Sequence, residues 1–355
     1  MQVVEYALYG VSTLTLVSSF LPLVKSDYWV FRVFEYPRFQ KLLLTVVCFA
    51  LFFYLREWNT IADKIMLVLL ATASGFLLYK VIPYKPLRKK EMKRAGQETD
   101  EGKVFKIFTA NVYQYNHHYD KFVELIQHAD ADLVFLLETD SAWQKGIGGA
   151  LDKLYPHSKH AVLDNTYGLM FYSKLPVIKA DINYLVEEDV PSLDAVIDLN
   201  GHTPIQIWGL HPKPPMPNEN LRSTAKDKEI MKIAFKAKDA RLPVIVFGDF
   251  NDVAWSHVTK LFRRVSGLLD PRRGRGFYST FHAKKWYMRF PLDYIFASEH
   301  FSLVDMKRLP ATGSDHFPIL TTLYFSYNNP VVQDGPEADK EDFEQAEEIL
   351  EKPVN

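Results

Sequence analysis

Near the end of the chain, two short motifs combine residues that bind metal ions or transfer protons. Gly-Asp-Phe-Asn at 248–251 follows the apolar run 244–247, and Gly-Ser-Asp-His at 313–316 precedes the apolar run 319–325. Carboxylate, amide and imidazole groups at strand ends are what metal-assisted hydrolysis of a phosphoester needs. The two motifs therefore indicate a hydrolytic site.

Three more polar residues, Asn111, Glu138 and His211, each lie at the end of an apolar, strand-like run. In α/β sheets, side chains at strand ends converge on one rim, where binding sites form. A single Asn or Glu at a strand end is more often a capping or turn residue, and a single Gly-Asp pair is more often a turn. All five motifs in this order favour one shared site.

The elements that must position these groups alternate between strands and helices. Hydrophobic periodicity predicts strands at 104–112, 133–137, 168–172, 195–199, 205–210, 244–247, 292–296 and 319–325, and helices at 119–129, 221–237 and 256–265. The helix at 221–237 is charged and periodic, so we expect it on the surface. The order predicts one α/β domain of mixed sheets covered by helices, over 104–326.

The first 84 residues differ in composition from the rest and predict a membrane domain, 1–84. The runs 6–24, 42–55 and 65–79 are apolar, and the third extends to 84 if Lys80 snorkels. The first holds 19 uncharged residues, close to the roughly 20 that span a bilayer. The shorter runs also fit buried or re-entrant helices. Three such runs so close together favour three transmembrane helices, and the lack of a basic segment before the first argues against a signal peptide.

The distribution of Lys and Arg predicts the side of the membrane. Four basic residues lie in 25–41, two in 56–64 and seven in 80–94. The positive-inside rule then places the large domain in the cytoplasm. The basic linker, 85–103, either contacts anionic lipid head groups or is simply solvated. The acidic tail, 327–355, is expected to be a solvated helix or disordered, without a function of its own.

Length, net charge and cysteine content limit the classes of protein to which the chain can belong. The chain has 355 residues, enough for one large domain with an appendage. Its formal net charge of -1 gives no global basic field that would favour nucleic acid. The single cysteine, Cys48, excludes an intramolecular disulfide and leaves the redox compartment undetermined.

The ordered motifs resemble the endonuclease/exonuclease/phosphatase superfamily, which has the deoxyribonuclease-I-like fold. The resemblance covers about 104–326 and rests on Asn111, Glu138, His211, the motif at 248–251, Thr280-Phe281, Leu292-Asp293-Tyr294 and Ser-Asp-His at 314–316. With its three preceding helices, the chain resembles a membrane-bound bacterial branch that includes VanJ-type teicoplanin-resistance proteins. The resemblance implies a four-layer α/β sandwich, a divalent metal and phosphoester hydrolysis.

The same resemblance implies the metal ligands. Glu138 is the expected principal ligand, Asn111 supports it, and Asp315 is expected to contact the metal as well. Hard oxygen ligands of this kind suit Mg²⁺ or Mn²⁺.

It also implies the catalytic groups. Asp249 orients or deprotonates the attacking water with help from Asn251, and Asp293 braces the site by hydrogen bonding. His211 and His316 flank the scissile phosphate. His316 acts as an acid, a base or a donor to the developing charge, oriented by the aspartate that precedes it. The identity of the general base stays open.

For several other residues the sequence allows both a functional and a purely structural interpretation. Tyr167 either donates a hydrogen bond to a phosphate oxygen or packs. Arg272, Arg273 and Arg275 form a glycine-rich basic loop that either clamps a substrate phosphate or is solvated. The apolar group at 286–290 is interpreted as core, with contact to a lipid tail as the alternative.

The leading hypothesis is a multi-pass, membrane-anchored, divalent-metal-dependent phosphoesterase of the bacterial cell membrane. Its expected partners are membrane lipids and a phosphorylated substrate. A lipid-linked phosphate is one candidate, because tethering raises the effective concentration of such substrates. A membrane-attached nuclease is the alternative, disfavoured because no stripe of Lys and Arg tracks a nucleic-acid backbone. A non-catalytic scaffold is disfavoured because every motif position holds a competent residue.

Three properties stay open at this level. VanJ-type relatives imply an extracytoplasmic domain, against the charge count. The preference for a monoester, a diester or a pyrophosphate is undetermined, and so is the oligomeric state.

Overall fold

The computed structural model of the chain describes residues 2–86, 88–96, 103–199, 201–327, 333 and 335–354. Outside these residues lie position 1 of the predicted membrane domain, positions 87 and 97–102 of the basic linker, position 200 of the α/β domain, and positions 328–332, 334 and 355 of the acidic tail.

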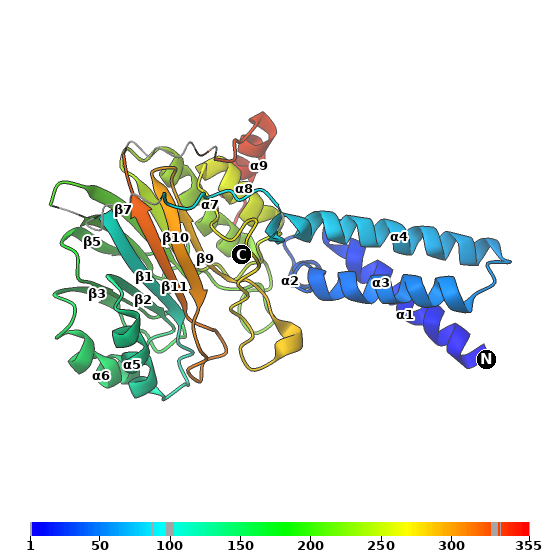
Figure 1. Cartoon of the computed structure of the whole chain (residues 1–355), viewed down its shortest axis with the longest axis horizontal. Coiled ribbons are helices and arrows are strands. Elements are labelled where there is room, and N and C mark those ends of the chain that lie inside the picture. Colours follow the sequence, from blue (N-terminus) through cyan, green and yellow to red (C-terminus); the bar gives the residue numbers. More distant parts are fainter. Residues whose placement is uncertain are drawn as a thin grey trace.

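Three long apolar helices form a stalk that projects from the rest of the chain, with the N-terminus at its far end (Figure 1). They are α1 (Gln2–Phe20), α3 (Arg38–Leu55) and α4 (Ile61–Val81). The turns η1 (Leu21–Leu23) and η2 (Ile82–Tyr84) extend two of them, and α2 (Trp29–Val33) lies at the base. By length and composition each helix is able to cross a membrane.

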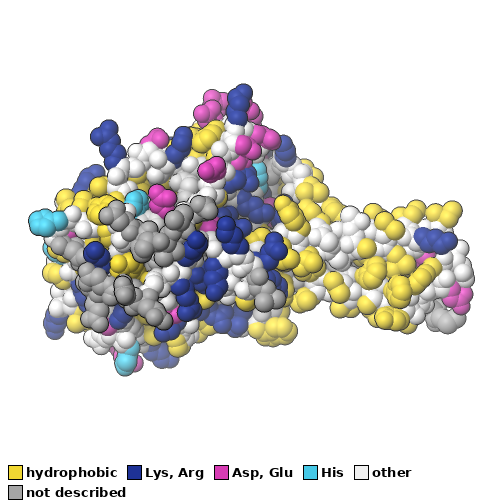
Figure 2. All heavy atoms as spheres, turned by 45° about the horizontal axis from the view of Figure 1, so that its top comes forward, with side chains coloured by type: hydrophobic (Ala, Val, Ile, Leu, Met, Phe, Trp, Pro, Cys, Tyr) yellow, Lys and Arg dark blue, Asp and Glu magenta, His cyan; other side chains and the backbone are white. Residues whose placement is uncertain are grey.

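The surface of the stalk is hydrophobic (Figure 2). Val3, Tyr54 and Ile61 are 80%, 81% and 77% exposed. A continuous apolar surface of this kind is rare on soluble proteins and marks contact with lipid or a partner. The three apolar runs predicted from the sequence are thus confirmed as helices of spanning length.

Two mixed sheets form the centre of the remaining domain. The first has the order β10-β11-β1-β2-β4-β3 and the second has the order β5-β6-β7-β8-β9. The strands are β1 (Val104–Asn111), β2 (Leu133–Leu137), β3 (His157–Ala161), β4 (Leu169–Ser173), β5 (Val177–Asn183), β6 (Ser192–Asp198), β7 (Pro204–Leu210), β8 (Val244–Asp249), β9 (Asp293–Ala297), β10 (Phe301–Arg308) and β11 (Ile319–Phe325).

Helices cover the outer face of each sheet. They are α5 (Tyr119–Ala129) and α6 (Ser141–Leu151) on the first sheet, α7 (Thr224–Lys238) and α8 (His257–Ser266) on the second, and α9 (Lys340–Glu351) against α7 and α8. Between the sheets, the rings of Phe135 and Phe247 meet at 4.9 Å. Burial of each such side chain contributes roughly 2 kcal/mol. The predicted four-layer α/β sandwich is confirmed.

Strand direction brings the polar motifs to one edge. β1 runs parallel to β2, and β7 runs parallel to β8, so the carboxyl ends of each pair lie together. β9 is antiparallel to β8, which puts its first residue, Asp293, opposite Asp249. Gly248 has a φ of +133°, and a Cβ there would lie 2.0 Å from the carbonyl oxygen of Leu210. Only glycine fits this close approach.

The prediction that the helix at 221–237 lies on the surface is wrong. Along α7, Lys226, Asp227 and Glu229 are only 2%, 4% and 1% exposed. The helix is covered by α9 and by residues at the base of the stalk, where Arg32 pairs with Asp227 at 2.6 Å. Charged residues tolerate such burial when they are paired.

Glu229 predicts a pH dependence of stability. Burial, followed by the charge of Glu187, raises the pKa of Glu229 to about 8 from 4.5. The folded chain therefore keeps the proton where the unfolded chain loses it, so stability falls as pH rises from 4.5 to 8 and stays reduced above. Glu229→Gln replaces the titrating carboxyl with a neutral amide, so the fall in stability between pH 4.5 and 8 should disappear. We expect a Tm roughly 5 °C higher than the parent at pH 8.5 and an equal Tm at pH 4.5, in thermal unfolding of the detergent-solubilised chain.

The control is Glu124→Gln on α5, because Glu124 is exposed. It should leave the Tm unchanged at both pH values. A gain for Glu229→Gln that is the same at pH 4.5 and pH 8.5 would contradict the titration and point to packing alone.

Candidate metal-dependent active site

Asn111 joins carboxylates from both sheets. Its side-chain amide donates to Oε1 of Glu138 at 2.7 Å and to Oδ2 of Asp249 at 3.2 Å. Glu138 follows β2 with a φ of +60°, and its other oxygen accepts the backbone N–H of Gln114 at 3.3 Å. The two sheets therefore contribute oxygen groups to one cluster.

The Gly-Asp-Phe-Asn motif fixes Asp249 at the end of β8. The backbone N–H of Asn251 donates to Oδ1 of Asp249 at 2.9 Å, with Asn251 at a φ of +47°. The amide of Asn251 donates to the carbonyl oxygen of Pro212 at 3.0 Å. This leaves Oδ2 of Asp249 directed at Asn111, so one oxygen of the carboxylate is held and the other faces the cluster.

His316 lies between two aspartates. Its Nδ1 is 2.8 Å from Oδ2 of Asp293, and its Nε2 is 3.6 Å from Oδ2 of Asp249. Burial alone would lower the pKa of His316, but Asp293 and Asp249 raise it to about 10. The imidazolium is therefore the stable form at neutral pH. The orienting bond expected from the preceding aspartate is made by Asp293 instead.

Asp315 is placed differently from its neighbour. Its backbone carbonyl oxygen accepts the N–H of Ala283 at 2.6 Å. Its carboxylate is close enough to Glu138 to raise the pKa of that group. Asp315 therefore lies beside the Asn111–Glu138 pair, where a role as metal ligand stays a prediction.

His211 and Tyr167 lie on the other side of Asp249. Nε2 of His211 is 4.0 Å from Oδ2 of Asp249, and burial, with His316 adding to it, lowers the pKa of His211 to about 4. His211 is therefore neutral, and its buried Nδ1 has no partner among the described residues. The Tyr167 ring lies 5.1 Å from the His211 ring, and its hydroxyl donates to Glu219 at 2.9 Å.

The cluster carries an excess of negative charge. Burial raises the pKa of Glu138 to about 7 and also raises that of Asp249, where Asp293 adds to the effect. Against the carboxylates of Glu138, Asp249, Asp293 and Asp315 stands one imidazolium, His316. Carboxylates crowded in this way favour a bound cation, which stabilises their ionised form.

The donor set fits a hard divalent metal. Among the described residues, ligand atoms of Asp249, Asp293 and His316 lie within 4.8 Å of one another. His316 is protonated and bonded through Nδ1 to Asp293, so it is a poor ligand in that state. The oxygens of Glu138, Asn111 and Asp249 offer the ligand types that magnesium-like ions prefer. The oxygen side of the cluster thus offers the donor types that fit such an ion, and His316 carries a proton.

Arg272 neither faces solvent nor is free to bind a substrate phosphate, the two interpretations that the sequence allowed for the arginine loop. This side chain is fully buried, with bonds to both oxygens of Asp270 at 3.0 and 2.9 Å and to the carbonyl oxygen of Asp293 at 3.2 Å. Because all of these contacts use its guanidinium group, Arg272 supports the backbone of Asp293 and is not available to bind a substrate phosphate. Arg273 pairs with Glu91 at 2.6 Å, and Arg275 donates to a backbone carbonyl.

An exposed aromatic turn joins the cluster to the stalk. In η4 (Trp286–Met288), Trp286 and Tyr287 are 78% and 56% exposed. The prediction that 286–290 is core is wrong for this turn, although Phe290 is buried. Gln40 of α3 donates to the carbonyl oxygen of Tyr287 at 3.1 Å, and the ring of Phe281 lies 5.0 Å from that of His316.

Residues at the base of the stalk form hydrogen bonds with the loop that follows Asp249. The sequence patterns did not predict these contacts. The hydroxyl of Tyr36 donates to the carbonyl oxygen of Asn251 at 2.6 Å, and that of Tyr84 donates to Ala254 at 2.6 Å. The indole N–H of Trp255 donates to the carbonyl oxygen of Glu35 at 2.7 Å. Single tyrosines between apolar runs carry no sequence signal for such distant contacts.

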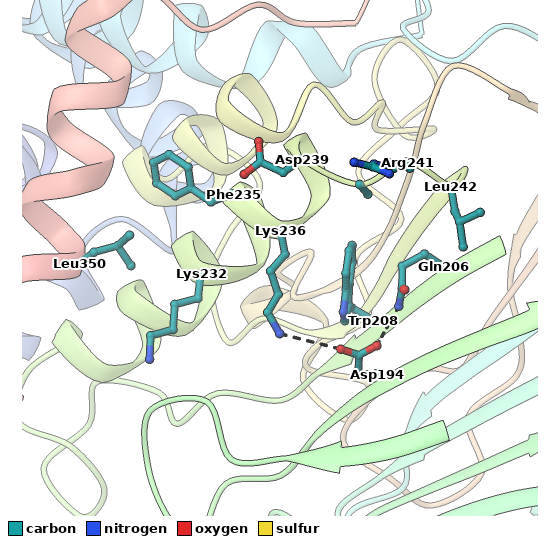
Figure 3. Close-up of a pocket in the computed structure, with 11 residues that line it drawn as sticks. Asp194, Gln206, Trp208, Lys232, Phe235, Lys236, Asp239, Arg241, Leu242 and Leu350 are labelled. Carbon is teal, nitrogen blue, oxygen red and sulfur yellow. Dashed lines mark hydrogen bonds and ion pairs between the residues drawn. The ribbon is translucent and has the colours of Figure 1, made fainter. Parts of the chain in front are cut away.

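A cavity of about 680 Å³ lies elsewhere, between the second sheet and α7 (Figure 3). Three of its polar groups pair with one another: Lys236 lies 3.8 Å from Asp194, which accepts from Gln206 at 2.9 Å. It contains none of the cluster residues. We therefore locate the site by its chemistry and not by this hollow.

A model of the Endonuclease/Exonuclease/phosphatase family matches residues 108–316. The match contains every motif from Asn111 to His316. No curated protein matches the chain, so the resemblance to VanJ-type proteins stays a prediction.

Solved structures share the fold at low identity. TDP2 from D. rerio, complexed with single strand DNA product, has a TM-score of 0.53 and 17% identity, over 63% of this chain and 99% of that chain. An endonuclease/exonuclease/phosphatase from Beutenbergia cavernae has 0.52 and 16%, over 63% and 72%. The human Nocturnin catalytic domain, with bound sulfate anion, has 0.51 and 18%, over 64% and 96%. These similarities show a common fold.

The contact between Tyr36 and Asn251 predicts that the stalk affects turnover. Tyr36→Phe removes the donor to the Asn251 carbonyl oxygen and leaves the ring in place. Loss of one such bond should cost about 1 kcal/mol of stability. A less fixed Asp249 loop should lower kcat roughly threefold to tenfold with an unchanged KM, measured on an activated phosphodiester with the full chain in detergent.

Tyr184→Phe, which alters a tyrosine that is 49% exposed, is the matched control and should leave both constants unchanged. A destabilised Tyr36→Phe protein with the parental kcat would reduce the contact to a purely structural one.

Proposed function

The chain belongs to the endonuclease/exonuclease/phosphatase family, and from this premise we propose that it is a membrane-anchored, divalent-metal-dependent phosphoesterase. The family fixes the reaction class as hydrolysis of phosphoester bonds. The observation that carries the proposal is a chain of hydrogen bonds and ion pairs that links Asn111, Glu138, Asp249, Asp293 and His316. Three of these residues lie in β1, β8 and β9, one directly follows β2, and one lies in the segment before β11.

The metal is proposed to be Mg²⁺ or Mn²⁺, held by Glu138 with Asn111, and with Asp315 nearby. When bound, it neutralises phosphate charge and lowers the pKa of water. The carboxylates that hold it are fixed by Asn111 and by backbone N–H groups, so little reorganisation is needed on binding. Hard oxygen ligands favour these ions over softer ones.

The protonation states divide the proton chemistry between the other residues. His316 carries a proton at neutral pH, so it is suited to donate to a phosphoryl or leaving-group oxygen and not to accept a proton first. Asp249, with one oxygen free of the Asn251 N–H, is the better acceptor for a proton from water. Neutral His211 is suited to hydrogen-bond the phosphate, and Asp293 holds the His316 tautomer.

The exposed aromatic turn supports a lipid-linked substrate. Trp286 and Tyr287 project beside the end of α3, where a bilayer surface would lie, and aromatic side chains of this type favour that layer. The same segment leads back to Phe281 against His316. A phosphate carried by a membrane lipid would therefore meet the cluster without leaving the interface.

The alternative is a membrane-attached nuclease. It is favoured by the fold shared with TDP2 from D. rerio, whose structure contains a single strand DNA product. Against it stands the commitment of Arg272 and Arg273 to ion pairs, which leaves fewer cations to follow a phosphodiester backbone. A non-catalytic scaffold is less favoured, because the family motifs retain every reactive group.

The decisive assay is phosphate release by the solubilised full chain from a polyprenyl pyrophosphate, phospholipids, nucleotides and DNA. We expect Mg²⁺-dependent release from a lipid-linked substrate, abolished by EDTA. Removal of a proton-transfer group typically costs 10²- to 10⁴-fold, so His316→Ala and Glu138→Gln should each lower kcat by about 100-fold or more.

His128→Ala, on the exposed face of α5, is the matched control and should retain full activity. Cleavage of DNA alone would establish the nuclease. Full activity in EDTA, or an unaffected His316→Ala protein, would refute the proposed mechanism.

The domain is proposed to face the cytoplasm. The base of the stalk carries the basic segments 25–41 and 80–94, and Lys and Arg side chains gather on the domain near that base (Figure 2). A green fluorescent protein fused at the C-terminus should fluoresce, and alkaline phosphatase fused there should be inactive. The opposite pair of results would place the domain outside.

A further inference from the structure

A polar cavity of about 440 Å³ lies where the stalk meets the domain. Its walls come from the end of α1, the end of α4, and helices α8 and α9, with Leu23, Tyr79, Lys80, Lys260 and Ile349 among the lining residues. The catalytic cluster contributes none of its residues to this cavity.

Four lysines line the cavity: Lys25 and Lys352 are exposed, whereas Lys80 and Lys260 are half-buried. Among the described residues, neither Lys80 nor Lys260 has a carboxylate within ion-pair distance, although both lie in the same hollow. Burial, followed by the charges of Lys80 and Arg38, lowers the pKa of Lys260 to about 7. Two cations held close together and partly out of water are unfavourable unless an anion joins them.

The acidic residues of the cavity do not meet this need. Glu35 is paired with Arg38 at 2.9 Å and with Arg32 at 3.3 Å, and Asp227 with Arg32 at 2.6 Å. Asp27 accepts from Thr224 at 2.6 Å and pairs with Arg222. Glu348 is exposed on α9. None of these carboxylates is therefore left to pair with the half-buried Lys80 and Lys260.

The position of the cavity identifies the anion. Leu23 and Tyr79, at the domain ends of α1 and α4, are 57% and 71% exposed, so the cavity rim is apolar on the stalk side and basic on the domain side. Lipid head groups lie at that boundary, with their acyl chains along the stalk. We propose that this cavity binds the phosphate head group of an anionic membrane lipid, separately from the catalytic site.

Occupancy of the cavity would also bear on the catalytic loop. Glu35 lines the cavity and accepts a hydrogen bond from Trp255, which follows the loop that carries Asp249. Asp227 also lines it and pairs with Lys226, which in turn pairs with Asp252 of that loop. The lipid would complete the charge pairing at the base of the stalk.

The test uses the full chain in a neutral detergent and native mass spectrometry, with dioleoyl phosphatidylglycerol, dioleoyl phosphatidylcholine and inorganic phosphate as separate probes. We expect phosphatidylglycerol to bind more tightly than phosphatidylcholine. The variant Lys80→Gln/Lys260→Gln should weaken phosphatidylglycerol binding by about 30-fold, as expected for two basic residues near a lipid phosphate.

The matched control is Lys89→Gln/Lys90→Gln, which removes the same charge from exposed positions of the basic linker at the same end of the stalk. It should bind as the parent does, and Lys80→Arg/Lys260→Arg should restore binding. Thermal unfolding of each variant in lipid-free detergent verifies the fold independently of lipid binding and of activity.

Each other result would overturn the proposal. Equal loss in both Gln pairs would indicate general attraction to the basic surface. Equal binding of both lipids would remove the charge selectivity. If inorganic phosphate bound to the cavity and displaced phosphatidylglycerol from it, the cavity would be a site for a soluble anion.

Discussion

The architecture of this chain depends on one constraint: a charge removed from water must be paired. Asp249 and Asp293 are buried at the ends of neighbouring strands, and His316 lies between them as an imidazolium. Behind them, Arg272 neutralises Asp270 and holds the backbone of Asp293. His316 and Arg272 thus offset part of the buried negative charge. Burial raises the pKa of Asp249, and against the effect of burial the two aspartates raise the pKa of His316.

The same constraint links the domain to the stalk. Lys226 pairs with Asp252 at 2.7 Å, next to the Asp249 loop, and with Asp227 at 3.1 Å, which in turn pairs with Arg32 of α2. A stalk attached only by a linker would leave Asp227 without its contact to Arg32. The helices that are long and apolar enough to cross a membrane are therefore also structural supports of the site.

Sequence patterns failed where tertiary contacts reverse the usual preference. α7 was expected at the surface because it is rich in Lys, Asp and Glu, yet ion pairs to α2 and to the loop bury these side chains. Trp286 and Tyr287 were expected in the core because they are aromatic, yet they project from the turn beside α3. The strands β3, β5 and β10 were not predicted, since their short or half-exposed runs lack an apolar signal.

By itself, the sequence determined the three apolar helices, the alternation of strands and helices, and the motifs from Asn111 to His316, because hydrophobic periodicity and strand-end residues are local properties. Only the tertiary structure decided which aspartate orients His316, that Arg272 is a brace, and that Tyr36 holds the Asn251 turn. These outcomes depend on contacts between residues far apart in the chain. Burial and neighbouring charge, which fix pKa values and ion pairs, exist only once those residues meet.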